Sequence, residues 1–125
     1  MHLMGFPHVA GQRYRMAQRM GGAISGRDLG NHLIDAGLDE DTMVEKLIHF
    51  MNHCKVGKVS MDKTVKIKEN CEGLRTKNFA EEVRVPSCYF TTGFLNGFFS
   101  SVRGQKVRET RCIVTGDPYC EWQFT

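Results

Sequence analysis

The sequence predicts an α+β fold in which a short antiparallel sheet is packed by three to four helices. Three segments carry apolar residues at helical spacing. Two pairs of short segments alternate apolar and polar residues around turn residues, as β-hairpins do. The length of 125 residues suits one domain with a modest core. We therefore expect a single domain over residues 1–125.

Composition excludes several classes of protein. With 41% hydrophobic and 25% charged residues, the chain has the composition of a soluble globular protein. No apolar run approaches the ~20 residues of a membrane span, and the first ten residues show no signal peptide. The odd number of cysteines, five, favours a reducing compartment and a cytoplasmic location. The net charge of +3 is spread among acids, so no contact with nucleic acid is expected.

The first helix is predicted from Gly11 to about Ala36, with Gly37 as its stop. Residues 1–10 suggest only a short strand or a disordered end. The candidate buried positions of the helix are Tyr14, Ala17, Ile24, Leu29, Leu33 and Ile34.

A stripe of glycines marks one face of this helix. Gly22, Gly26 and Gly30 are spaced four apart, and each costs up to about 1 kcal/mol in helix propensity. Such a stripe indicates that another backbone comes close. The partner is a second helix of the same chain or a helix of a symmetry mate, and a helix broken at Gly21–Gly22 is a third alternative. The stripe motivates the prediction of a homodimer.

The middle of the chain predicts a helix followed by a hairpin. Asp39 is the expected N-cap of a helix from Glu40 to about His53. Residues 58–61 and 64–68 form the two strands of the hairpin, with Val59, Met61, Val65 and Ile67 facing inward. Residues 69–85 give no clear pattern.

The third helix is predicted from Cys88 to about Arg103, after Pro86 and with Ser87 as its cap. Phe90, Phe94 and Phe98 recur at intervals of four, which is normally a core pattern. The positive end of the helix dipole is expected to lower the pKa of Cys88 toward the thiolate.

The last forty residues predict a metal site. A strand over residues 105–113, a turn at 116–118 and a strand over 119–124 place Cys112 and Cys120 at facing ends of a hairpin. Three thiolates and a carboxylate suit a tetrahedral zinc ion, so Cys88, Glu109, Cys112 and Cys120 are the predicted ligands. Glu109 and Cys112 share a side only if the strand bulges near residues 110–111. Without a CxxC pair, cysteines packed as small hydrophobes remain the alternative.

Three motifs resemble the 4-vinyl reductase domain family. They are CYFTTGFLNGFF at residues 88–99, ETRC at 109–112 and GDPYC at 116–120. The family includes archaeal proteins described as hydrocarbon-binding and the sensor domains of bacterial activators that respond to aromatics. The similarity covers roughly residues 86–124, and the segment between the first two cysteines is about two residues shorter than in those sensors.

The resemblance implies a zinc site and a ligand. In the aromatic sensors a zinc ion is held at positions that match Cys88, Glu109, Cys112 and Cys120 one by one. A small hydrophobic or aromatic ligand lies between helices and sheet, beside the zinc hairpin, and the sensors form dimers. For this chain, the resemblance makes Phe94 and Phe98 the first candidates for ligand contacts.

Other residues extend the candidate ligand pocket. Trp122 alternates onto one face of the last strand with Cys120, so it adds an aromatic wall. His49 and His53, one helical turn apart, would supply a polar contact if they face inward. The alternative is an exposed pair on the outer face of their helix.

Together these features predict a zinc-containing binding domain for a small hydrophobic or aromatic molecule. No catalytic residues are expected, because the chain has no Ser/His/Asp order, phosphate loop or HExxH motif. A zinc ion with four protein ligands has no open position for water, so its role would be structural. The resemblance leaves two alternatives: a subunit of a tetrapyrrole or hydrocarbon reductase, and a protein-interaction module like the related subunits of a vesicle-tethering complex.

Overall fold

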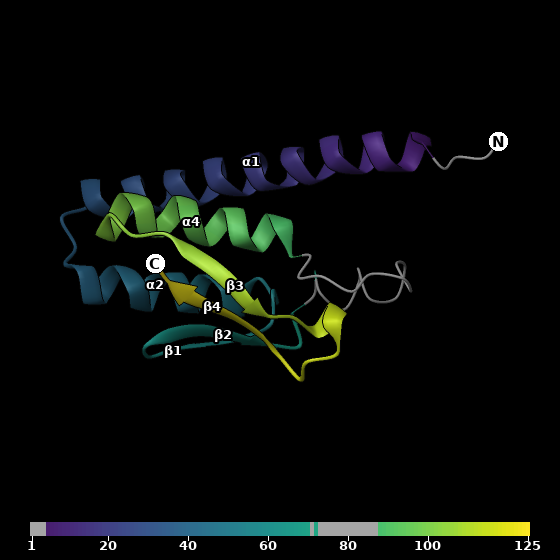
Figure 1. Ribbon diagram of the computed structural model, residues 1–125. Coiled ribbons are helices and arrows are strands. Elements are labelled where there is room, and N and C mark those ends of the chain that lie inside the picture. The colour runs from purple at the N-terminus through teal and green to yellow at the C-terminus, as the bar shows by residue number, and fades with distance from the viewer. Residues whose placement is uncertain (1–4, 71, 73–87) are drawn as a thin grey trace.

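The computed structural model describes residues 5–70, 72 and 88–125 (Figure 1). Side chains are described from residue 13 onward, except that of Tyr14. The elements are α1 (Gly5–Asp35), α2 (Glu40–His53), β1 (Lys58–Met61), β2 (Thr64–Lys68), α4 (Tyr89–Arg103), β3 (Val107–Arg111), the 3-10 turn η1 (Ile113–Thr115) and β4 (Cys120–Phe124).

The four strands form one antiparallel sheet in the order β1-β2-β4-β3. Helices α2 and α4 pack on the sheet, and α1 lies along the outer side of α4 (Figure 1). This arrangement confirms the predicted α+β class. In the described part of the chain, no helix is long and apolar enough to cross a membrane.

The core lies between the sheet and the two helices that pack on it. Its largest fully buried side chains are Trp122, Phe98, Phe99, Leu47, Met51 and Ile67. The ring of Phe99 meets those of Phe98 and Phe124 edge to face, with centroids 5.2 and 4.9 Å apart. Edge-to-face contacts of this kind stabilise the core beyond the area that the rings bury.

The predicted second helix and the first hairpin are confirmed at their predicted bounds. The Asp39 carboxylate accepts a hydrogen bond from the Thr42 amide at 2.8 Å, as an N-cap does. In the hairpin, Met61 pairs with Val65 and Val59 with Ile67, so the alternating apolar residues share one side.

The first helix differs from its prediction in length and in its buried face. It begins at Gly5 instead of Gly11 and runs unbroken through Gly21 and Gly22. Leu33 is buried and Leu29 is half-buried, but Ala17, Ile24 and Ile34 are exposed. The physical reason is that α1 touches the rest of the described chain mainly through α4, so only one narrow face of it is covered. The predicted burial of Tyr14 lies outside the described side chains.

The glycine stripe is the contact between α1 and α4. A Cβ atom at Gly22 or Gly26 would overlap the carbonyl oxygen of Phe90 or Phe94. The contact is mutual, because a Cβ atom at Gly93 or Gly97 of α4 would overlap a backbone carbonyl of α1. The stripe therefore serves a helix contact within the chain and no longer supports the predicted homodimer.

A carboxylate caps the beginning of α4. Glu72 accepts hydrogen bonds from the amides of Phe90 at 2.8 Å and Thr91 at 2.9 Å, and from the Thr91 hydroxyl at 2.7 Å. A negative charge at this end also interacts favourably with the helix dipole. Glu72 is 16 or more positions upstream of α4 in the sequence, so local patterns did not identify it. The predicted cap, Ser87, lies outside the described residues.

Candidate metal centre

A β-bulge in β3 brings Glu109 to the same side as the cysteines. Glu109 pairs with Trp122 and Arg111 pairs with Glu121, and the register shifts between these two pairs. The extra residue, Thr110, turns the strand so that Glu109 and Cys112 face one another. The bulge predicted near residues 110–111 is confirmed.

The turn between Cys112 and Cys120 is held by Asp117. The Cys112 amide donates to the Asp117 carboxylate at 2.9 Å, and the Asp117 amide donates to the Cys112 carbonyl at 3.1 Å. Gly116 has φ of 99°, in the left-handed region that favours glycine. This closed turn folds the chain back, so Cys120 at the start of β4 returns to Cys112.

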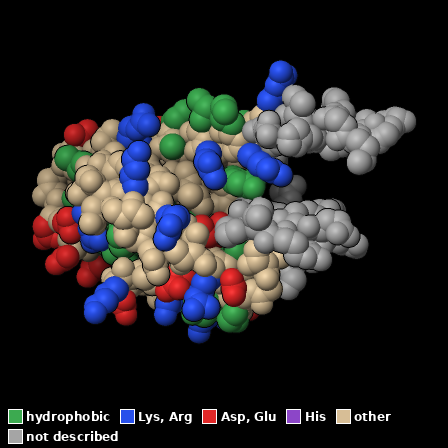
Figure 2. Space-filling model, viewed as in Figure 1, with side chains coloured by type: hydrophobic (Ala, Val, Ile, Leu, Met, Phe, Trp, Pro, Cys, Tyr) green, Lys and Arg blue, Asp and Glu red, His purple; other side chains and the backbone are tan. Residues whose placement is uncertain are grey.

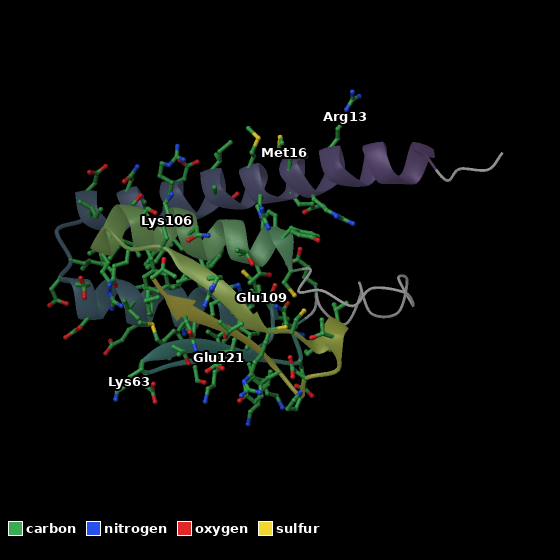
Figure 3. All side chains as sticks on the ribbon, in the orientation of Figure 1. Arg13, Met16, Lys63, Lys106, Glu109 and Glu121 are labelled. Atoms are coloured by element: carbon green, nitrogen blue, oxygen red, sulfur yellow. The ribbon has the colours of Figure 1, made fainter. Side chains whose placement is uncertain are left out.

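The four predicted ligands converge in the structure. One side-chain donor atom each of Cys88, Glu109, Cys112 and Cys120 lies within 4.8 Å of the others. The Cys88 sulfur is 3.7 Å from the sulfurs of both Cys112 and Cys120, and all three cysteines are buried. Cys88 comes from the start of α4 and Glu109 from β3, where Figure 3 shows it. The cluster therefore joins the helix layer to the sheet.

The geometry of the cluster fits a metal ion. A separation of 3.7 Å is far beyond a disulfide bond of about 2.05 Å, and no disulfide joins these three cysteines. A tetrahedral ion with metal–sulfur bonds of ~2.3 Å requires sulfurs about 3.8 Å apart. Glu109 Oε1 accepts a hydrogen bond from the Cys88 amide at 3.3 Å, whereas its Oε2 is buried without a hydrogen-bond partner in the described structure. A cation in the cluster would satisfy that oxygen.

Without a cation, the cluster holds its protons. Hydrogen bonds with Cys112 and Cys120, followed by burial, raise the pKa of the Cys88 thiol. The hydrogen bond with Cys112 raises the pKa of Cys120 to about 12, and burial raises the pKa of Glu109 to about 8. The expectation that the helix dipole lowers the pKa of Cys88 is wrong for the metal-free protein, because neighbouring sulfurs and burial outweigh the dipole. Metal binding must therefore release protons.

The raised pKa of Glu109 predicts a pH dependence for the metal-free protein. Its folded-state pKa of about 8 lies above the ordinary value of 4.5, so the folded state holds this proton more tightly than the unfolded state does. The stabilisation is complete below the ordinary pKa and is lost as the pH rises toward 8. Urea unfolding of chelator-treated protein should show a fall in the free energy of unfolding from about pH 5 to 8.

The matched variant for this pH series is Glu109→Gln, which keeps the shape of the side chain and cannot ionise. The difference in pH slope between the two proteins isolates the carboxyl group from the histidines, which titrate in the same range. Identical slopes would contradict a buried, protonated Glu109.

Hydrogen-bond donors surround the sulfurs. The side-chain nitrogen of Asn70, which is fully buried, lies 3.7 Å from the Cys88 sulfur. The Ile113 amide donates to the Cys120 sulfur at 3.4 Å. Donors of this kind stabilise thiolates and orient ligands around a metal. Asn70 was missed by sequence analysis, because it belongs to a segment without a recognisable pattern.

The aromatic candidates fall into two groups. Phe98 and Trp122 are fully buried, and the Trp122 indole donates to the Thr92 hydroxyl at 2.9 Å. Phe94 instead lies between two partly exposed rings, with its centroid 6.2 Å from Phe50 and 6.5 Å from Phe90. We call Phe50, Phe94 and Phe90 the aromatic row. The exposure of Phe90 corrects its predicted place in the core.

His49 and His53 lie on the exposed side of α2. Their rings stack on each other with centroids 6.1 Å apart. The inward orientation considered from the sequence is wrong, because Met43, Leu47 and Met51 occupy the buried face of this helix. The two histidines form the exposed pair that was the alternative.

Comparison with known proteins gives a family match and a structural relative. Residues 64–125 match the 4-vinyl reductase domain. An uncharacterized protein of Methanocaldococcus jannaschii, MJ0150, is 29% identical over 104 residues, which cover 78% of this chain and 58% of that protein. The crystal structure of the phenol-responsive sensory domain of the transcription activator PoxR, with phenol, superposes with a TM-score of 0.76 at 19% identity.

The structural match shows a shared fold. It covers 90% of this chain and 64% of the PoxR domain chain, so this chain spans less than two thirds of the length of either relative. The segment that matches the family includes β2, α4, β3 and β4 and all four residues of the cluster. Through residues 64–125, the chain belongs to the 4-vinyl reductase domain family.

Proposed function

We propose that residues 1–125 form one domain that binds a small hydrophobic or aromatic molecule and holds one structural zinc ion. The observation that carries the ligand proposal is the aromatic row, with rings partly open to solvent, on the fold of a phenol-responsive sensory domain. The buried, partnerless oxygen of Glu109 within the cysteine cluster supports the metal.

Zinc is the metal that this set of donors favours. Three thiolates select a soft or borderline ion over magnesium or calcium, and the cluster suits tetrahedral coordination. Cys88, Glu109, Cys112 and Cys120 would together complete the tetrahedron, so no position is left for a reacting water. The ion would therefore join the start of α4 to the hairpin of β3 and β4 and would not act on a substrate.

The aromatic row is the proposed ligand contact. Phe50 is 42% exposed and Phe90 is 40% exposed, while Phe94 between them is 8% exposed. Their ring planes lie within 15° and 20° of that of Phe94, so all three are nearly parallel. A small aromatic molecule would cover the open sides of these rings and gain offset-stacked contacts. Phe98 and Trp122 would shape the site from the core beneath.

Substitution of the exposed rings tests the ligand proposal. Phe50→Ala and Phe90→Ala should each weaken the binding of phenol or toluene about two- to tenfold, since an aromatic contact contributes ~0.5–1.5 kcal/mol. Titration calorimetry measures the change. Met16→Ala removes an exposed apolar side chain from α1, outside the row, and should leave affinity unchanged. Absence of saturable binding by the wild type, or an equal loss with Met16→Ala, would contradict the proposal.

We also propose a homodimer and a cytoplasmic location. Because α4 covers the glycine stripe, a dimer would use the outer side of α1, where Met16, Met20 and Ile24 are exposed at intervals of four. Figure 2 shows hydrophobic side chains along the outside of this helix, and Met16 points away from α4 in Figure 3. An exposed apolar row of this kind is typical of association surfaces.

A further inference from the structure

A pocket of about 320 Å³ lies between α1, α4 and β3. Arg19 comes from α1, Tyr89 from α4 and Arg108 from β3, so only the folded chain brings them together. No ring of the aromatic row lines it. Its volume is within the range of about 300 to 1,000 Å³ that is usual for small-molecule sites.

The pocket carries positive charge without a counter-ion. Within the described residues, the ion pairs involve Lys58, Lys66, Arg103 and Arg111, and neither Arg19 nor Arg108 takes part in one. The Arg19 guanidinium lies 5.3 Å from the Tyr89 ring centroid, within cation–π range, so the wall of the pocket helps to position it.

The acid in the lining does not offset these charges. Glu109 lines the pocket, but its Oε1 accepts from the Cys88 amide and its Oε2 is buried. Its carboxyl group is therefore directed to the cysteine cluster. On the face seen in Figure 2, Lys and Arg side chains gather over α1, whose Arg19 forms one wall.

The uncharged polar groups of the lining are left as donors. The Asn96 side-chain oxygen accepts from the Val107 amide at 2.7 Å, which leaves its amide nitrogen to donate. The Thr92 oxygen accepts from the Trp122 indole at 2.9 Å, so its hydroxyl hydrogen remains available. Two guanidinium groups, an amide and a hydroxyl thus line one pocket as donors, and such a lining favours a ligand rich in acceptors and negatively charged.

We propose that this pocket binds a small organic carboxylate, with the carboxylate between Arg19 and Arg108. Arginine binds a carboxylate through two parallel hydrogen bonds, which suits two guanidinium groups on facing walls. Val107, which is buried, and the ring of Tyr89 supply apolar surface for the rest of the ligand. The site is separate from the aromatic row and takes a charged ligand in place of a neutral one.

Calorimetric titration of the full chain with acetate, hexanoate and benzoate tests the proposal, with benzamide as the neutral counterpart of benzoate. At least one carboxylate should bind saturably, and benzoate should bind more tightly than benzamide. Arg19→Gln and Arg108→Gln should each weaken that binding about tenfold or more. Arg27→Gln is the matched control, because Arg27 is an exposed arginine of α1 that does not line the pocket, and it should change affinity less than twofold.

Several results would overturn the proposal: no carboxylate binding below about 10 mM, equal binding of benzoate and benzamide, or an equal loss with Arg27→Gln. Tighter binding of inorganic phosphate than of every carboxylate would overturn the ligand class. Metal content should be unchanged in Arg108→Gln, which adjoins Glu109. Phenol binding should be unchanged in both pocket variants, so failure here is distinguishable from failure of the aromatic-row proposal.

Discussion

Cys112→Ser is expected to release the metal and to unfold the hairpin of β3 and β4. Structural zinc contributes about 10 kcal/mol or more to the folding of small domains, whereas a whole domain is stable by only about 5 to 15 kcal/mol. A hydroxyl in place of one thiolate removes a ligand from a buried cluster and leaves Glu109 without its cation. Elemental analysis should fall from about one zinc per chain to near zero. Circular dichroism should show a large fall in thermal stability.

The chain supplies a matched control in Cys54→Ser. Cys54 is exposed and lies outside the cluster, so this variant should keep both its zinc and its melting temperature. Cys120→Ser should behave like Cys112→Ser. The metal proposal fails if reduced, folded wild-type protein contains no metal, or if Cys112→Ser retains one zinc per chain with unchanged stability.

Gly26→Leu is expected to destabilise the fold by about 3 kcal/mol or more, because its first side-chain carbon already overlaps the Phe94 carbonyl oxygen. The obstacle is backbone, so it cannot be relieved by rotating a side chain. Helices α1 and α4 would have to separate along the whole contact that Gly22, Gly26, Gly93 and Gly97 make possible. Urea unfolding should show the loss as a lower midpoint.

Gly21→Ala is the matched control in the same helix. A Cβ atom at Gly21 meets nothing within 4 Å, so alanine should raise stability by about 0.5 to 1 kcal/mol through its better helix propensity. The two neighbouring sites thus predict opposite signs. Light scattering of the same samples separates folding from association: loss of a dimer by Gly26→Leu without loss of stability would place the stripe in a subunit interface.

Local signals made part of the fold predictable. The Asp39 cap, the helix from Glu40 to His53 and the hairpin that follows depend on hydrogen bonds and alternation within a few residues. The bulge was also deducible, because Glu109 and Cys112 cannot share a side of a regular strand. The identity of the metal cluster rested on the three motifs that resemble the family, since spacing alone left packed cysteines as an alternative.

Other features depended on contacts between distant segments. The sequence showed the glycine stripe and could not say which helix fills it, because a close approach in the same chain and one between copies need the same residues. The exposed side of α1 was misassigned because its apolar pattern does not reveal which face meets α4. Glu72 caps a helix far along the chain, and Asn70 reaches Cys88 across 18 positions.

By itself the sequence determined the element types, most of their bounds and the residues that form the cysteine cluster. These follow from backbone hydrogen bonding, side-chain alternation and motif spacing, which act over short distances along the chain. Only the tertiary structure decided the partner of the glycine stripe, the exposure of the aromatic row and the pocket between Arg19 and Arg108. Those depend on how α1, α4 and β3 pack, and packing brings together residues whose separation in sequence carries no local signal.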